Sequence, residues 1–146
     1  MRYYEDIEIG RAIRGTVEYL VTEEEILEMG RRWDPQPFHT DPEAAAASTF
    51  GGLVASTVHL FAIAVRIGME GTPIAAVSSL GMKNFVSHTP ARPGDVVHHE
   101  EEVVSRRVSK SRPAMGIVTF MGSLVNQRDE KVFSFESTAL VHCRPA

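Results

Sequence analysis

An aspartate and a histidine stand five positions apart in the segment 34–39 (DPQPFH), and both side chains can take up and release protons. Pro35 and Pro37 exclude a regular helix across the segment, because proline lacks an N–H and restricts the residue before it. We therefore expect a stiff loop that holds Asp34 and His39 at a nearly fixed separation. Such a pair suits proton-transfer chemistry, which needs titratable groups positioned together. Residue types alone also allow a structural role, in which Asp34 ends one helix and His39 packs beside the next.

The residues that follow this segment predict a helix start and a sharp turn. Asp41 can cap a helix whose first position is Pro42, and Glu43 places a negative charge in its first turn, where the helix dipole favours it. Gly51 and Gly52 then allow the chain to reverse direction. These features would fix the C-terminal side of the acid–base segment.

A long apolar stretch, 53–69, predicts a buried helix because it is apolar nearly all round. It is too short, and too interrupted by His59 and Arg66, to be a membrane span. Ser56 and Thr57 lie near its start, where backbone N–H groups have no partner within the helix and can bind a developing negative charge on an oxygen. The alternative is that both hydroxyls only bond the neighbouring turn.

The rest of the chain predicts strands around this helix. A capping box formed by Thr22 and Glu25 should open a helix that leads to Asp34, with Glu25 reaching back to the cap. Strand patterns cover 12–20, 74–86, 95–106, 115–125 and 131–142, the last two as a hairpin. One long apolar helix followed by a run of antiparallel strands indicates an α+β fold with the sheet wrapped around the helix.

Two segments carry a family resemblance: 33–44 (WDPQPFHTDPEA) and 50–56 (FGGLVAS) resemble the hydratase motif of MaoC-like dehydratases, the (R)-specific enoyl-CoA hydratases. The resemblance continues in 90–95 (PARPGD), 109–113 (SKSRP) and 126–127 (NQ). It implies the hot-dog fold, an antiparallel sheet wrapped around a long central helix, as a single domain over 1–146. It also implies a homodimer whose sheets join edge to edge near the active site, and unpaired sheet edges favour a dimer on physical grounds.

The same resemblance implies a hydro-lyase. It would catalyse the reversible hydration of trans-2-enoyl-CoA to (R)-3-hydroxyacyl-CoA, or dehydrate a related hydroxyacyl-CoA, with coenzyme A or acyl carrier protein as the thiol carrier. Asp34 would act as base on the water, while His39 would orient the water and supply a proton at C2. Backbone N–H groups near Ser56 and Thr57 would bind the thioester oxygen. Gln36 stands where relatives often carry asparagine and can hydrogen-bond the loop.

Four basic residues form a cluster at a predicted hairpin end. It can be a solvated surface, or it can hold the phosphates of coenzyme A by charge-assisted hydrogen bonds. Its members are Arg106, Arg107, Lys110 and Arg112.

Two other functions compete with hydration. Thioesterases of the hot-dog fold place their acid on the long helix, and the stretch 53–69 contains no aspartate or glutamate. A non-catalytic acyl-thioester binding module is the second alternative, but such a module has no need of the Asp34 and His39 pair. We therefore rank hydration first.

The composition excludes several classes of partner. With 146 residues, 43% hydrophobic and 23% charged, the chain has the composition of a globular domain, and its net charge of −4 argues against a nucleic-acid surface. The six histidines lack metal-site spacing, so we expect no metal and no cofactor apart from coenzyme A in the substrate. No leader segment or membrane span is expected, and the single cysteine, Cys143, favours a reducing, cytoplasmic compartment.

Overall fold

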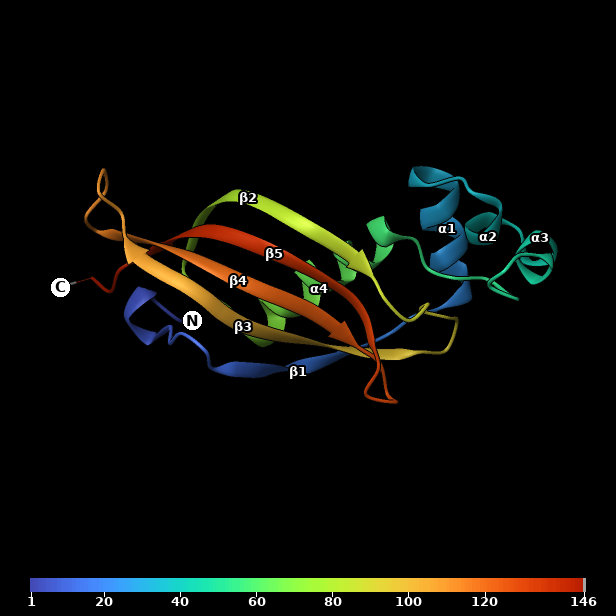
Figure 1. The fold of residues 1–146 in the computed structure, drawn as a ribbon, viewed down its shortest axis with the longest axis horizontal. Coiled ribbons are helices and arrows are strands. Elements are labelled where there is room, and N and C mark those ends of the chain that lie inside the picture. The colour runs from blue at the N-terminus through green and yellow to red at the C-terminus, as the bar shows by residue number, and fades with distance from the viewer. Residues whose placement is uncertain (146) are drawn as a thin grey trace.

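A five-stranded antiparallel sheet curves around one long helix (Figure 1). The computed structural model describes residues 1–145, and the sheet order is β1-β3-β4-β5-β2. The strands are β1 (Ala12–Leu20), β2 (Ala76–Ser87), β3 (Val96–Val108), β4 (Met115–Val125) and β5 (Lys131–His142). The helices are the short 3-10 helix η1 (Tyr4–Asp6), α1 (Glu23–Trp33), α2 (Pro37–Thr40), α3 (Pro42–Ala47) and α4 (Thr57–Gly71).

The helices divide into two groups. In Figure 1, α4 lies behind the sheet, whereas α1, α2 and α3 gather at one end of it. Both termini and the β3–β4 connection lie at the opposite end. This confirms the predicted α+β fold, and β1, β4 and β5 have the predicted boundaries.

The start of α4 differs from the prediction by four residues. Ser56 caps the helix by accepting a hydrogen bond from the His59 backbone N–H at 3.2 Å, so the helix begins at Thr57. The preceding backbone is held elsewhere, because the N–H of Ala55 donates to the Ala91 carbonyl. Among residues 1–145, no helix combines the length and hydropathy that a membrane crossing requires.

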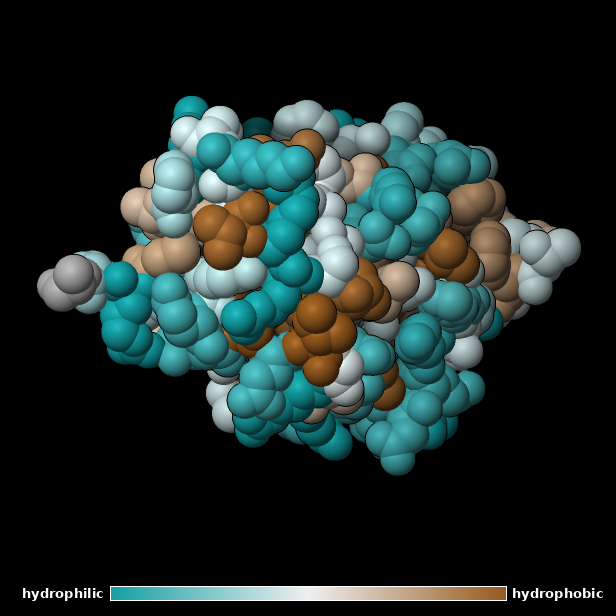
Figure 2. All heavy atoms as spheres, turned by 60° about the vertical axis from the view of Figure 1, so that its left-hand side comes forward, coloured by the Kyte–Doolittle hydropathy of each residue, from teal (hydrophilic) through white to brown (hydrophobic). Residues whose placement is uncertain are grey.

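The prediction that the long helix is buried all round is wrong for the single chain. One face of α4, including Leu60 and Ile67, packs in the core against the sheet. On the other face Val58, Val65 and Met69 are between 41% and 48% exposed. A curved sheet can cover only one side of a helix, so the second apolar face needs another surface. Figure 2 shows apolar groups reaching the surface among hydrophilic ones on one face of the molecule.

Strand β2 extends this exposed apolar surface. It forms one edge of the sheet, and all twelve of its residues are exposed. Its Phe85 ring lies 5.1 Å from the Phe61 ring of α4, so the two elements are neighbours. We call their exposed side chains the apolar face: Val58, Val65 and Met69 of α4, and Val77, Leu80, Met82, Phe85 and Val86 of β2.

The capping box at α1 forms only in part. The Thr22 hydroxyl accepts a hydrogen bond from the Glu25 N–H, as predicted. The Glu25 carboxylate instead accepts from the Tyr19 hydroxyl, at 2.6 and 2.8 Å, and lies 3.4 Å from Nε2 of His59. Burial and this hydrogen bond raise the pKa of Tyr19 to about 12. The tertiary contacts of Glu25 therefore replace the local bond expected from the motif.

His99 of β3 is enclosed between two glycines. A methyl carbon placed on Gly68 of α4 would lie 3.2 Å from its ring, and one on Gly122 of β4 would lie 3.2 Å from Nε2. Burial, aided by the charge of Arg2, lowers the pKa of His99 from 6.5 to about 4. The imidazole is therefore neutral in the folded protein at neutral pH.

This shift predicts a loss of stability in acid. The unfolded chain takes up a proton on His99 near pH 6.5, whereas the folded chain resists protonation until about pH 4, so acidification between these values favours unfolding. His99→Phe should lose less stability than the wild type over the same window, because it removes this linkage. Thermal unfolding midpoints of both proteins across a pH series measure the difference. Parallel curves would contradict the prediction.

Candidate active site

Asp34 and His39 meet at the junction of α1 and α2. Asp34 is the C-cap of α1, and its N–H donates to the Gly30 carbonyl at 3.0 Å. His39 lies on α2, a one-turn helix that Pro37 opens at its first position, where proline is favoured. The expectation of a loop over the whole segment is therefore wrong, although the prolines do break the helix between the two side chains.

The geometry defines which nitrogen of His39 can take part in chemistry. Nδ1 lies 2.6 Å from the carbonyl oxygen of Val54, which can only accept, so Nδ1 carries a hydrogen. Nε2 faces Asp34, 3.5 Å from Oδ2. The Gln36 side-chain amide donates to the other carboxylate oxygen of Asp34 at 3.2 Å, which is the loop bond expected of it. One carboxylate oxygen is thus held, and the other faces the imidazole.

Close packing holds the backbone of α2 against α1. A methyl carbon placed on Gly30 would lie 2.9 Å from both the carbonyl carbon and the Cβ of His39. Real Cβ atoms do not approach this closely, so α2 can sit here only because residue 30 has no side chain. The position of the His39 ring therefore depends on a glycine in the neighbouring helix.

A cavity of about 220 Å³ opens in front of this pair. Residues on α2, α4 and β5 and at the end of β2 and beyond form its wall. Polar side chains line it both at the Asp34 and His39 end and at Thr57, Ser87, His88 and Thr89, and the rest of the wall is apolar. Its lining comprises Asp34, Gln36, Phe38, His39, Phe50, Val54, Ala55, Thr57, Leu60, Ser87, His88, Thr89, Pro90, Ala91 and Val132.

The structure separates the two residues predicted to bind the substrate oxygen. Thr57 lines the cavity as the first residue of α4, in the turn whose N–H groups have no carbonyl within the helix to pair with. Its hydroxyl lies 2.9 Å from that of Ser87. Ser56 is buried, caps α4 and is not among the lining residues. The cap explains this difference, because the Ser56 hydroxyl must turn back toward the helix to bond the His59 N–H.

No sequence motif predicted the residues that close the cavity opposite His39. Ser87 ends β2 and His88 follows it, and His88 is held through its Nε2, 2.8 Å from the Ser134 hydroxyl of β5. Their position depends on the pairing of β2 with β5, which brings together residues about 50 positions apart in the chain. No local motif records that register.

The basic cluster does not reach the cavity within one chain. Arg106 and Arg107 lie in the part of β3 that pairs with the start of β4, at the end of the sheet opposite α1 and α2 (Figure 1). The Arg106 guanidinium donates to the carbonyls of Tyr4 and Ile7 and stacks 4.5 Å from the Tyr4 ring. It therefore anchors the N-terminal segment. Lys110 and Arg112 lie in the adjoining turn.

Two further histidines lie beside separate carboxylates. His59 is buried beside Glu25, and His98 lies 3.0 Å from Glu100. Within residues 1–145, His, Cys, Asp and Glu side chains form no group of three arranged to hold a metal ion.

Comparison with known proteins finds a matching family model and a similar solved structure that carry the same family name. Residues 6–120 match the model of the family described as "MaoC like domain". A crystal structure of a MaoC-like dehydratase from Rhodospirillum rubrum is 36% identical, covers all of both chains and superposes with a TM-score of 0.92. The uncharacterized protein YdeM of Bacillus subtilis is 28% identical over 94% of this chain and 96% of its own. These two relatives therefore match all or nearly all of this chain.

A more distant structure shares the fold. The (R)-hydratase PhaJ1 of Pseudomonas aeruginosa is 18% identical and covers 97% of this chain and 86% of its own, with a TM-score of 0.73. At this identity the likeness concerns the fold alone. The sheet wrapped around α4 is the hot-dog fold.

Proposed function

Because the chain belongs to the MaoC-like dehydratase family, we propose that it is a hydro-lyase of acyl thioesters. The reaction is the addition of water to a trans-2-enoyl thioester, giving the (R)-3-hydroxyacyl thioester, and its reverse. The observation that carries the proposal is the juxtaposition of Asp34 and Nε2 of His39, 3.5 Å apart, at the end of a largely apolar cavity. An acyl-binding module would need the cavity but not the pair.

The pair can move one proton from a water molecule to the substrate. Water bound between Asp34 Oδ2 and His39 Nε2 loses a proton to the carboxylate as its oxygen bonds to C3. The proton passes by way of Nε2 to C2, so the C=C π bond is replaced by one C–O and one C–H bond. Both the added hydroxyl and the added hydrogen come from the same water, and no net proton is consumed. The hydrogen bond from Nδ1 to the Val54 carbonyl keeps Nε2 directed at Asp34.

The start of α4 supplies the group that stabilises charge. As the hydroxyl adds to C3, negative charge develops on the thioester oxygen. The N–H of Thr57, at the cavity wall and in the first turn of α4, is the donor we assign to that oxygen, and the helix dipole favours the same charge. Gln36 has a positioning role, because its amide fixes one oxygen of Asp34.

Turnover on defined thioesters tests the function. The purified protein should hydrate enoyl-CoA esters of several lengths, followed by loss of the conjugated absorbance, with the (R)-3-hydroxy product identified by chiral chromatography. Activity should persist after exhaustive chelation, since the proposed steps use only side chains and backbone. Release of free coenzyme A thiol without hydration would identify a thioesterase instead. Activity that zinc alone restores after chelation would contradict the metal-free mechanism.

We propose in addition that the protein is a homodimer formed through the apolar face. Val65 of α4 and Leu80 of β2 are 41% and 52% exposed, and several large apolar side chains exposed on neighbouring elements mark a surface for association. Val65→Asp combined with Leu80→Asp should convert the dimer to a monomer, because two copies of each charge would be buried at the interface. Light scattering at micromolar concentration measures the mass.

Val104 provides the matched control. It is 45% exposed on β3, outside the apolar face, so Val104→Asp should leave the dimer intact. A wild-type monomer, or loss of the dimer in the control as well, would contradict the assignment of the interface.

A further inference from the structure

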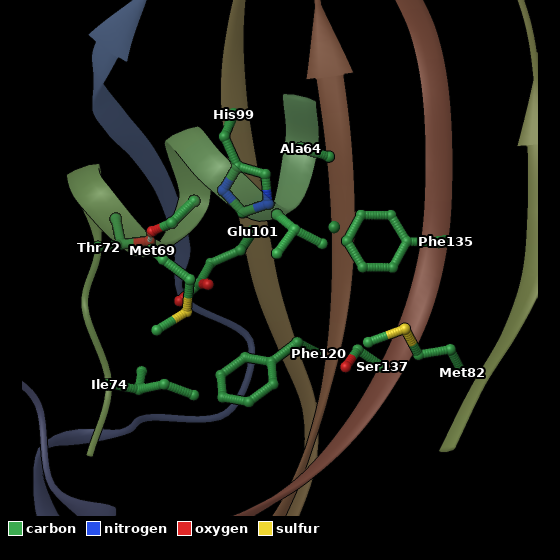
Figure 3. A pocket seen from close by; sticks show the side chains of 13 residues that line it. Ala64, Met69, Thr72, Ile74, Met82, His99, Glu101, Phe120, Phe135 and Ser137 are labelled. Atoms are coloured by element: carbon green, nitrogen blue, oxygen red, sulfur yellow. Dashed lines mark hydrogen bonds between the residues drawn. The ribbon is translucent and has the colours of Figure 1, made fainter. Parts of the chain in front are cut away.

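Two buried histidines carry ring nitrogens that make no hydrogen bond. Among residues 1–145, the buried side-chain polar atoms without a partner are both ring nitrogens of His59 and Nδ1 of His99. His99 faces a cavity of about 130 Å³ that Met69 and Met82 also line (Figure 3), and both methionines belong to the apolar face. His99 therefore lies next to the proposed dimer interface. His59 lies elsewhere, on the side of α4 that faces Glu25 of α1.

The ring of His59 faces a carboxylate that is itself fixed. Nε2 of His59 lies 3.4 Å from Oε2 of Glu25, which is longer than an ideal hydrogen bond, so the contact is an attraction between the charge and the polar edge of the ring. Both oxygens of Glu25 accept from the Tyr19 hydroxyl, at 2.6 and 2.8 Å. The pKa of Tyr19, raised to about 12 by burial and by this bond, keeps that hydroxyl protonated as a donor. Strand β1 and helices α1 and α4 are thus joined through Tyr19, Glu25 and His59, which we call the Glu25 network.

The Glu25 network lies close to the Asp34 and His39 pair but outside the cavity. Glu25 stands in the first turn of α1, and Asp34 caps the other end of the same helix. His59 stands in the first turn of α4, which Thr57 begins. A positive charge on His39 lowers the pKa of His59, so a charge on one ring acts on the other. Neither Glu25 nor His59 lines the cavity beside Asp34, so neither can touch a substrate bound there.

His59 is neutral in the folded protein at neutral pH. Burial is the main cause of its lowered pKa, and the charge of His39 adds to this, while the Glu25 carboxylate opposes both. A neutral imidazole carries one hydrogen, and a carboxylate that faces Nε2 favours the tautomer with that hydrogen on Nε2. The charge of Glu25 thereby sets the orientation of the ring. A neutral His59 also allows His39 to carry a second hydrogen during proton transfer, since a charged neighbour would oppose it.

We propose that His59, held in place by Glu25, is a positioning residue for the Asp34 and His39 pair. The inference rests on the proposed hydro-lyase and names two residues that act on its site from outside the cavity. The Glu25 network fixes the first turn of α4 to α1, so the Thr57 N–H and the Asp34 carboxylate keep the separation that addition of water needs. Breaking the network should therefore impair the alignment of the reacting groups more than the binding of the thioester.

The first experiment compares kcat with binding. His59→Leu fills the site with an apolar side chain and removes the N–H that faces Glu25. It should reduce kcat on the best enoyl thioester at least about tenfold and change the dissociation constant of the saturated counterpart, measured by calorimetry, less than about twofold. His59→Gln is the conservative variant, because its amide is a neutral donor of similar reach, and it should keep kcat within about threefold of the wild type. Normal turnover in His59→Leu, or equal losses in the two variants, would overturn the proposal.

Glu25→Ala breaks the network from the other side and replaces His59→Leu if that variant does not fold. It should reduce kcat at least about fivefold. Glu24→Ala is its matched control, because Glu24 is exposed in the same turn of α1 and carries the same charge. This control should leave kcat unchanged. Equal effects of the two changes would mean that charge at the helix start, and not the contact with His59, controls the rate, and would overturn the proposal.

The ring of His39 gives a measurement that needs no turnover. Its Nδ1–H donates to the Val54 carbonyl at 2.6 Å, and the rate at which this hydrogen exchanges with water reports how firmly the ring is held. The rate is measured by NMR on protein with labelled histidine, and the resonance is assigned by its absence from His39→Ala. His59→Leu should raise the rate at least about tenfold, whereas His59→Gln should exchange like the wild type. An unchanged rate in His59→Leu would overturn the proposal.

Failure of the hydro-lyase and failure of the role of His59 give different results. Faster exchange in His59→Leu, together with a wild type that hydrates no enoyl thioester, would reject the hydro-lyase and keep His59 as the residue that holds His39. Hydration by the wild type, with kcat and exchange unchanged in His59→Leu, would reject only the role of His59.

Discussion

Asp34→Asn and His39→Ala should each reduce kcat on the best enoyl thioester by at least about a hundredfold, the usual contribution of a positioned acid or base. Asparagine keeps the size of the aspartate but cannot accept the proton of the water. Alanine at position 39 removes the nitrogen that faces Asp34 at 3.5 Å. The measurement is kcat at saturating substrate for each purified variant. Near-normal turnover in either variant would reject the acid–base assignment.

Thermal melting separates loss of chemistry from loss of folding. Asp34→Asn should melt close to the wild type, because Asp34 is partly exposed and its replacement has the same shape. His39→Ala should melt lower, since the buried ring donates to Val54 and the carbonyl would lose that partner. A His39→Ala protein that is inactive only because it is unfolded would not support the assignment, so activity is measured well below its melting point.

Two further variants complete this test. The double mutant of Asp34 and His39 should be little slower than the slower single mutant, because two groups that act on one water function as a unit. Glu43→Gln is the control. Its carboxylate belongs to the first turn of α3, which Asp41 caps, and it does not line the cavity, so kcat should barely change. A large effect of Glu43→Gln would mean that charge near the site, and not the pair itself, controls the rate.

Gly30→Ala should reduce both stability and turnover. The added methyl group would lie 2.9 Å from the His39 carbonyl carbon, and because this neighbour is backbone, α2 must move as a unit. We expect a loss of about 1–3 kcal/mol in the free energy of unfolding, as for other overpacked sites. Displacement of the His39 ring should reduce kcat at least about tenfold in the molecules that remain folded. Chemical denaturation and kcat at low temperature measure the two effects.

Gly116→Ala is the matched control for this prediction. A methyl group there would lie 2.6 Å from Cγ of the Tyr4 ring, so this change also overpacks the protein. Gly116 is the second residue of β4, which starts at the end of the sheet away from α1 and α2 (Figure 1). It should therefore destabilise the fold and leave kcat unchanged. If Gly30→Ala lowers stability without lowering kcat, the site does not depend on the contact between α1 and α2.

The sequence predicted the features that local physics controls. Alternating side chains and turn residues located β4 and β5, and Asp41 with Pro42 marked the start of α3. The same local features identified Asp34 and His39 as neighbours, because two prolines and five positions leave few arrangements of the backbone. The family and the α+β fold followed from these motifs.

Tertiary structure decided what depends on residues distant in the chain. The register of β2 against β5 placed Ser87 and His88 at the cavity, and the Val54 carbonyl selected the nitrogen of His39 that faces Asp34. The Glu25 carboxylate accepts a hydrogen bond from the Tyr19 hydroxyl of β1 instead of forming the predicted bond to the cap of its own helix. The sequence pattern shows which positions of a helix are apolar, but not which surface will cover each of them. It therefore could not show that one face of α4 stays exposed in the single chain.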